Sequence, residues 1–203
     1  TYTFTAVVKE TTDTTLTQNP SVNFNTANFT TISSTTTVTS ASANLNLYLT
    51  GGTITFDSTT QGLTFGHIFI RGASVRHTST TTTTVYRLQF SAASLTVQSG
   101  SINVDGMGYT STYSYGSSGP ATTLASSNVS TTYYAGASHG GLGGQASTAA
   151  VGTTFDSYSN PTLPGGGSAY SSGGGGVIRL TVTGPCIINS GATISSVGSG
   201  SYG

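Results

Sequence analysis

The hydrophobic residues of this chain fall into short runs in which apolar side chains alternate with Thr, Ser and Asn. The clearest runs lie near the C-terminus, at 177–182, 186–189 and 192–197, separated by Gly184-Pro185 and Ser190-Gly191. Runs of this length with a period of two, closed by glycine-containing turns, predict β-strands. Three such strands in succession predict the sides of one coil, which must stack on another coil to bury its inward side chains.

Similar strand pairs recur through the first half of the chain. Apolar or alternating stretches occur at 22–24, 29–32, 45–49, 53–56, 63–70, 86–90 and 95–104. They recur about every 20 to 25 residues, a length suited to one coil of a β-solenoid. We therefore expect about four coils within residues 22–105. Tyr2, Phe4, Ala6 and Val8 also alternate and predict a first strand.

The composition changes near residue 106. Of the 28 glycines, 22 lie from Gly106 onward, whereas 28 of the 41 threonines lie before residue 101. The pattern predicts an all-β protein, a parallel β-helix (β-solenoid), in three parts. Thr-rich coils occupy 1–105, a Gly/Ser/Tyr-rich insertion packed on the solenoid occupies 106–176, and 177–203 hold a returning coil and the start of a further repeat.

An internal repeat supports this division. Residues 95–109 are similar to residues 186–202, and the two Ser-Gly corners, at Gly100 and Gly191, are 91 residues apart. In both places a strand, a Ser-Gly corner and a second strand lead into Gly-x-Gly and a tyrosine. Chance similarity in a biased sequence is the alternative explanation. A genuine repeat would make the chain one segment of a longer array.

The glycine-rich region resembles a known kind of repeat. Its successive parts are 138–144, 158–161, 165–167, 173–180 and 191–195. Together, over residues 136–200, they resemble glycine-rich β-solenoid repeats of very large bacterial and protist surface and filament proteins. The resemblance implies a right-handed parallel β-helix with a structural or adhesive role.

The charge balance excludes several classes of partner. Only 5% of residues are charged and the formal net charge is zero. The five basic residues form no cluster, which argues against nucleic acid and against an anionic membrane surface. No stretch approaches the roughly 20 apolar residues of a membrane span. The 41 Thr and 31 Ser side chains keep the surface wet without charge.

No catalytic constellation is recognisable. The glycine runs lack the lysine of a phosphate-binding loop, and Gly173–Gly176 precede a strand rather than a helix. The carboxylates Glu10, Asp13, Asp57, Asp105 and Asp156 form no spaced pair of the kind that glycosidases need, although Asp57 and Asp105 would meet if they lay on neighbouring coils. His67, His77 and His139 form no spaced metal pair. We predict no enzyme, cofactor or metal, and interpret His139 as a packed or hydrogen-bonded ring.

Hydroxyl, amide and thiol groups give the candidate modification sites. Asn28 and Asn128 begin N-glycosylation sequons, and Thr80, Thr81, Thr82, Thr83 and Thr84 form a run open to O-glycosylation. The single cysteine, Cys186, is interpreted first as a small apolar residue buried in a strand, because free cysteine is often buried. A contact or bridge to another chain is the alternative.

These features predict a structural subunit of an extracellular or cell-surface filament. We expect the subunit to be glycosylated and to assemble head-to-tail into a homopolymer, because the ends of a solenoid expose unpaired strand edges. An adhesin that binds glycans is the first alternative. An ice-binding solenoid is the second, with Thr35, Thr37 and Thr39, Thr53 and Thr55, and Thr80, Thr82 and Thr84 as the Thr-x-Thr arrays that would have to lie in register.

Overall fold

The computed structural model describes residues 2–5, 21–24, 28–38, 45–56, 62–81, 83–110, 113–116, 119–123, 138–141, 143, 154–167 and 173–199. Within these ranges every regular element is a β-strand and no α-helix occurs, which confirms the predicted all-β class. None of the described segments forms a helix with the length and apolar character needed to cross a membrane.

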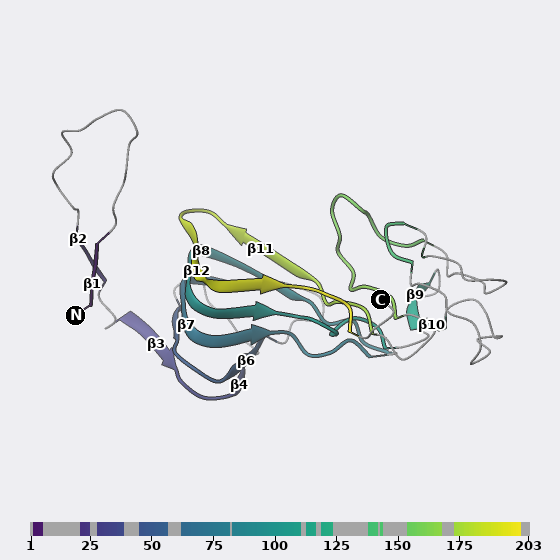
Figure 1. Cartoon of the computed structure of the whole chain (residues 1–203), viewed down its shortest axis with the longest axis horizontal. Coiled ribbons are helices and arrows are strands. Elements are labelled where there is room, and N and C mark those ends of the chain that lie inside the picture. The colour runs from purple at the N-terminus through teal and green to yellow at the C-terminus, as the bar shows by residue number, and fades with distance from the viewer. Residues whose placement is uncertain are drawn as a thin grey trace, which may run out of the picture.

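Eight strands form one curled parallel sheet (Figure 1). Five passes of the chain build it, and each pass lies beside the next. They are pass 1 with β3 (Phe29–Ile32) and β4 (Thr36–Val38), pass 2 with β5 (Asn46–Leu49) and β6 (Thr53–Phe56), pass 3 with β7 (Leu63–Arg76), pass 4 with β8 (Leu88–Asn103), and pass 5 with β11 (Ile178–Val182) and β12 (Cys186–Ser195). All pairings between passes are parallel.

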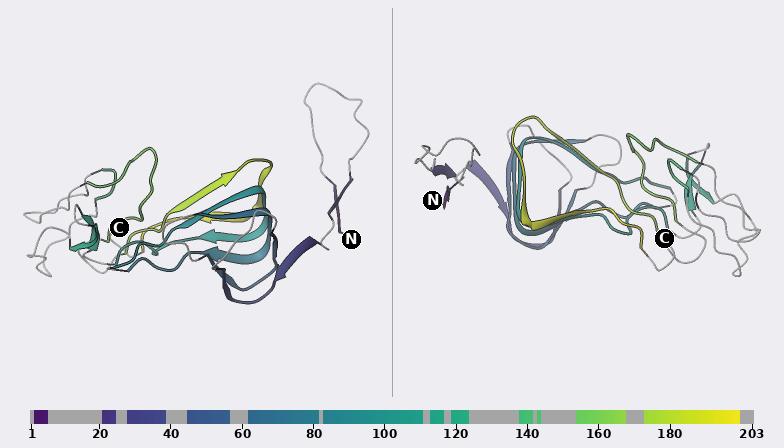
Figure 2. Two further views of the ribbon diagram at one scale, coloured as in Figure 1. Left: turned by 180° about the vertical axis from the view of Figure 1, so that it is seen from behind. Right: turned by 45° about the horizontal axis from the view of Figure 1, so that its top comes forward.

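Each pass turns a corner, so that the sheet curls into a half-barrel instead of lying flat. Viewed along the stack, the strands of successive passes lie nearly over one another and bend at the same place (Figure 2, right). Gly52, Gly72 and Gly100 occupy the corners with φ of 72°, 91° and 93°, a backbone conformation that residues with a Cβ rarely adopt. A Cβ on Gly100 would also overlap the carbonyl oxygen of Ala73 on the neighbouring pass.

Inward side chains of successive passes stack into apolar columns. Leu49, Ile70 and Val97 form one column, and Ile54, Val75 and Ile102 form another. All six are at most 1% exposed. Full burial of one such side chain stabilises a fold by roughly 1.5 to 3 kcal/mol, and the parallel register repeats the gain at each pass.

Three phenylalanines fill the wider part of the interior. The ring of Phe56 lies with its centroid 5.5 Å from that of Phe65 and 5.6 Å from that of Phe90. Phe65 and Phe90 meet edge to face at 6.2 Å. Such aromatic pairs add packing energy beyond simple area burial.

The two copies of the internal repeat lie side by side. β12 pairs with β8 so that Cys186 lies opposite Leu95 and Ile188 opposite Val97, an offset of 91 residues. The register then shifts by one residue before Gly191, which lies opposite Ser99. The two similar sequences are therefore neighbouring strands of the sheet. The glycine-rich excursion leaves the sheet after pass 4 and returns beside it as pass 5.

Glycine-rich segments meet where the excursion leaves and returns. The amide of Gly108 donates to the carbonyl of Gly174 at 2.7 Å, and that of Tyr109 donates to Gly165 at 2.9 Å. The amide of Gly165 donates in turn to Gly175 at 2.8 Å. A Cβ on Gly108 would lie 2.5 Å from the carbonyl oxygens of both Gly165 and Gly175. Gly108 and Gly174 therefore lie where neighbouring backbones leave no room for a side chain.

Two pairs of short strands stand outside the curled sheet. β1 (Tyr2–Thr5) and β2 (Ser21–Phe24) pair antiparallel, and so do β9 (Tyr113–Gly116) and β10 (Gly119–Thr123). The expected coil beginning at Val22 is therefore wrong, because β2 finds its partner in β1. The described passes begin at residue 28.

Candidate functional site

The edge of the sheet formed by pass 5 is the candidate functional site. β11 and β12 pair with β8 on one side, and no described strand pairs with their other side. The amide of Leu95 donates to Pro185 and that of Val104 donates to Ser195, both at 3.0 Å. Backbone groups alternate along a strand, so those of Ile188 and Ile194 point to the free side. We call this side the C-edge.

The apolar columns of the interior end at the C-edge. Ile188 continues the column of Val97 and is 41% exposed, and Ile194 continues the column of Ile102 and is 46% exposed. Val97 and Ile102, one pass below, are fully buried. The exposure of the two isoleucines therefore arises from their place at the end of the stack, because nothing described lies above them.

The opposite edge, which we call the N-edge, is formed by β3 and β4. Each of these strands pairs on one side only, β3 with β5 and β4 with β6. The inward positions of pass 1 are Thr30, Ile32, Thr36 and Val38, of which Ile32 and Val38 are half-buried and the threonines are exposed. The free backbone groups of the N-edge face away from pass 2, and those of the C-edge face away from pass 4. Because all strands are parallel, these two free sides are complementary.

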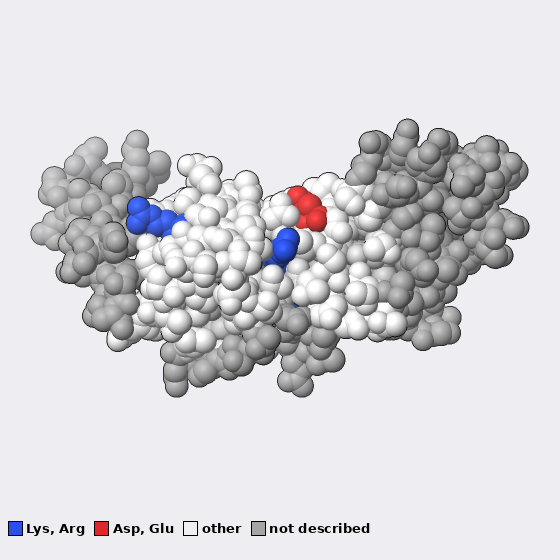
Figure 3. All heavy atoms as spheres, turned by 90° about the horizontal axis from the view of Figure 1, so that it is seen from below, with Lys and Arg blue, Asp and Glu red and all other residues white. Residues whose placement is uncertain are grey.

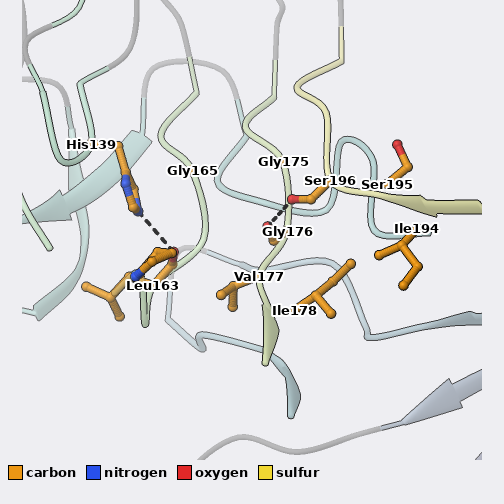
Figure 4. A pocket seen from close by; sticks show the side chains of 11 residues that line it. His139, Leu163, Gly165, Gly175, Gly176, Val177, Ile178, Ile194, Ser195 and Ser196 are labelled. Carbon is orange, nitrogen blue, oxygen red and sulfur yellow. Dashed lines mark hydrogen bonds between the residues drawn. The ribbon is translucent and has the colours of Figure 1, made fainter. Parts of the chain in front are cut away.

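A cavity of about 570 Å³ opens beside the C-edge (Figure 4). Its walls include Ile178 of β11, Ile194 of β12 and Ser196. His139, Pro161 and Leu163 line it from an arm that we define as residues 138–141, 143 and 154–163. The mouth of the curled sheet is thus hollow and mostly apolar at the end where its columns stop.

His139 is held within the arm by several contacts. Its Nε2 atom lies 3.0 Å from the carbonyl oxygen of Leu163, and its ring centroid lies 4.8 Å from that of Phe155 in an edge-on arrangement. The same Nε2 is 3.4 Å from the carboxylate of Asp156. The expectation of a packed, hydrogen-bonded ring is confirmed. Among the described residues no group of three His, Cys, Asp or Glu side chains is placed to hold a metal ion.

Asp156 fixes the turn of the arm. Its Oδ2 accepts hydrogen bonds from the amides of Thr162 at 2.6 Å and Leu163 at 2.7 Å, and its Oδ1 accepts one from the Thr162 hydroxyl at 3.0 Å. Burial alone would raise the pKa of the Asp156 carboxyl, but these hydrogen bonds outweigh it and hold the pKa below its ordinary value. Arg87 Nε donates to the carbonyl of Thr162 at 2.6 Å and so joins the arm to pass 4.

Asp105 joins passes 4 and 5 at the C-edge. Its Oδ1 accepts hydrogen bonds from the Ser195 hydroxyl and the Val197 amide, both at 2.6 Å. These bonds, led by that of Ser195, lower the pKa of the Asp105 carboxyl. Asp105 is thus held by pass 5 and Asp156 by its own turn. Glu10, Asp13 and Asp57 lie outside the described residues, as does the expected stacking of Asp57 on Asp105.

Cys186 is exposed, and the expectation that it is buried is wrong. It continues an inward column through Leu47, Ile68 and Leu95, all of which are buried. The strand and the inward direction were predicted correctly. The thiol is exposed because its column ends at pass 5.

The glycosylation candidates differ in accessibility. Asn28 is exposed and accepts, through its carbonyl oxygen, a hydrogen bond from Asn46 Nδ2 at 3.2 Å. Thr80 is 2% exposed and its hydroxyl receives the amide of Tyr86 at 3.3 Å, so its place among the candidates is corrected. Thr81 and Thr83 are exposed and Thr84 is half-buried, whereas Asn128 and Thr82 lie outside the described residues.

Threonine arrays stack only at the N-edge end of the sheet. Thr37 lies in register with Thr55, and the amide of Thr53 donates a hydrogen bond to the hydroxyl oxygen of Thr35 at 3.1 Å. In pass 3 the corresponding positions are Ser74 and Arg76. A continuous threonine lattice, which the ice-binding hypothesis requires, is not formed by the described strands. Thr39 and Thr82 lie outside them.

Sequence reasoning missed the role of His77. The side chain is fully buried, its Nδ1 lies 2.6 Å from the carbonyl oxygen of Thr78, and its Nε2 accepts the amide of Val177 at 3.3 Å. Burial lowers the pKa of the ring, although the hydrogen bond to Thr78 opposes the shift. The signal was present, because alternation from Ala73 and Val75 places residue 77 inward.

Charged side chains are few and scattered on the face drawn in Figure 3, with uncharged surface between them. The described residues on this face therefore form no strongly charged patch. Comparison of the chain with protein-family models, with curated proteins and with solved structures gives no match.

Proposed function

We propose that this chain is a structural subunit that assembles head-to-tail, with the C-edge of one copy pairing in parallel with the N-edge of the next. In this proposal the curled sheet is one segment of a continuous β-solenoid, and the polymer is an extracellular or cell-surface filament that carries glycans. The observation that supports it most directly is the pair of free parallel edges at opposite ends of one stack.

The two edges suit each other in hydrogen bonding. An isolated edge strand leaves amide and carbonyl groups unpaired and is a template for another strand. The C-edge and the N-edge belong to strands that run in the same direction, and every existing contact between passes is parallel. A second copy related by translation along the stack would extend the same pattern without reversing a strand.

The columns also continue across such a contact. If pass 1 of the next copy follows pass 5 as the passes follow one another, Ile188 meets Ile32 and Ile194 meets Thr36. Covering the exposed isoleucines would remove apolar area from water, the main driving force of association. No charged residue occupies these inward positions in passes 1 and 5, so no unpaired charge would be buried.

Two neighbouring residues provide a matched test. Ile188 points inward and Ile187 outward, yet they are similarly exposed in a single copy, at 41% and 48%. We expect the unmodified chain to form particles that lengthen with concentration in sedimentation velocity and negative-stain images. Ile188→Lys should remain a single subunit, because it would bury a charge, whereas Ile187→Lys should assemble normally.

Two results would contradict the proposal. One is an unmodified chain that stays a single subunit at every concentration. The other is equal assembly by Ile188→Lys and Ile187→Lys, which would show that the inward column does not enter the contact. Circular dichroism of the two variants would establish that both are folded before they are compared.

A further inference from the structure

A polar hollow lies on the outer surface of the sheet, and its lining includes none of the inward residues of passes 1 and 5. Its volume is about 310 Å³, close to the lower limit for a small-ligand site. The side chains that line it include Thr37, Thr55, Arg76, His77, Thr78 and Ser79. Four of these six carry hydroxyl groups, and one carries a permanent positive charge.

The sheet register aligns Thr37, Thr55 and Arg76. Thr37 of pass 1 lies opposite Thr55 of pass 2, which lies opposite Arg76 of pass 3. Two hydroxyls and a guanidinium therefore form one outward column at the spacing of adjacent strands, about 4.8 Å. Thr78 and Ser79, which follow His77, also line the hollow. The donors come from three adjacent passes.

Arg76 is the charged side chain among the described residues that line the hollow. No described carboxylate lines it, and no described Asp or Glu forms an ion pair with Arg76. Among the described carboxylates, Asp105 is held by Ser195 and Val197 and Asp156 by Thr162 and Leu163, whereas Asp57 lies outside the described residues. Both ring nitrogens of His77 are occupied, by Thr78 and Val177. Arg76 is exposed, so its guanidinium is available to a ligand.

We propose that this hollow binds an oxyanion, a carboxylate or sulfate group. A guanidinium matches such groups with two parallel hydrogen bonds, and adjacent hydroxyls donate to the remaining oxygens. Two sources can supply such a group. One is an acidic sugar, for whose ring the hollow has room, and the other is a free inorganic anion.

The test uses three probes on the unmodified chain, followed by amide chemical shifts. Methyl glucuronide carries the carboxylate on a sugar, sodium sulfate supplies the free anion, and methyl glucoside is the neutral control. We expect saturable shifts at Thr55, Arg76 and Thr78 with the first two and none with the third. Tighter binding of methyl glucuronide assigns the sugar as source, and tighter binding of sulfate assigns the inorganic anion.

Two matched variants locate the site. Thr55→Val removes a lining hydroxyl, and Thr53→Val removes one from the same strand and face that does not line the hollow. We expect Thr55→Val and Arg76→Gln each to weaken binding at least about tenfold, and Thr53→Val to leave it unchanged. Absence of shifts with both anions, or equal binding by Arg76→Gln and the unmodified chain, would overturn the proposal. Neither result depends on whether the chain assembles.

Discussion

The Nε2 atom of His77 accepts a hydrogen bond from the backbone amide of Val177, a contact of 3.3 Å between residues 100 positions apart. His77 directly follows the strand of pass 3 and points inward, and Val177 directly precedes the first strand of pass 5. The bond requires a neutral ring with its proton on Nδ1, which the carbonyl of Thr78 accepts at 2.6 Å. It ties the returning chain, and with it the C-edge, to the interior of the sheet.

Acid should weaken this fold through His77. Burial lowers the pKa of the folded ring below 6.5, its value in the unfolded chain. The stabilising contribution is therefore complete above about pH 6.5 and declines as the pH falls below it. We expect the urea midpoint to fall between pH 7.5 and pH 5.0, and His77→Gln to lose most of this dependence.

Other groups do not share this pH window. Asp105 and Asp156 have lowered pKa values, so their contributions persist until the pH falls through about 4. Arg76, which precedes His77 and lines the same hollow, is the same in the unmodified chain and in both variants. His67→Gln, at an exposed histidine, is the control and should retain the dependence. A midpoint that does not change between the two pH values would rule out the role assigned to His77.

The place where the glycine-rich segments around Gly108, Gly165 and Gly174 meet should not tolerate an added methyl group. A Cβ on Gly174 would overlap the carbonyl of Gly165, whereas one on Gly141 would meet nothing within 4 Å. We expect Gly174→Ala to destabilise the fold by roughly 1 to 3 kcal/mol and Gly141→Ala to have little effect, as measured by urea denaturation. Equal stability of the two variants would show that the close backbone approach is not maintained in solution.

The arm should loosen when Asp156 is replaced by Asn. One carboxylate oxygen accepts the amides of Thr162 and Leu163 and the other accepts the Thr162 hydroxyl. The neutral amide oxygen of Asn would replace these charge-assisted hydrogen bonds with bonds about half as strong. We expect amide exchange at Thr162 and Leu163 to accelerate at least roughly tenfold. Asp105→Asn, which changes a carboxylate elsewhere, should leave both rates unchanged, and acceleration by that variant would argue against a local effect.

The reactivity of Cys186 should report assembly. The thiol is exposed in a single copy and lies in an inward column that a second copy would cover. We expect a maleimide to label single subunits rapidly and assembled particles slowly. In a Cys186→Ser background, Thr193→Cys places a thiol on the outward side of the same strand and should react equally in both states. Unchanged labelling of Cys186 on assembly would exclude the C-edge from the contact.

Local pattern predicted the strands and the repeat well. The alternation around Leu47, Ile54 and Leu95 gave both the strands and the inward positions, because burial on one face of a strand follows a period of two. The offset of 91 residues between the repeats equals the register of β12 on β8 up to Ile188. Glycine corners were visible as well, since residues at positive φ are preferentially glycine.

Features set by the order of stacking were not visible in the pattern. Cys186 and Ile188 have the local pattern of core residues, and only the absence of a described neighbour beyond β12 exposes them. Val22 alternates like the strands of the sheet but pairs with Phe4 in an antiparallel hairpin. Pairing partners depend on the whole chain, which a local alternation does not encode.

The most direct measurement of head-to-tail stacking uses the native thiol. In the proposed register Cys186 of one copy lies opposite Thr30 of the next, because Thr30, Leu47, Ile68, Leu95 and Cys186 occupy one inward column. Adjacent strands place such Cα atoms about 4.8 Å apart, within reach of a disulfide. After mild oxidation, Thr30→Cys should give a ladder of covalent multimers on a non-reducing gel, and Thr31→Cys, which points outward, should not. A Thr30→Cys chain that stays monomeric, or a Thr31→Cys chain that cross-links as well, would contradict the account.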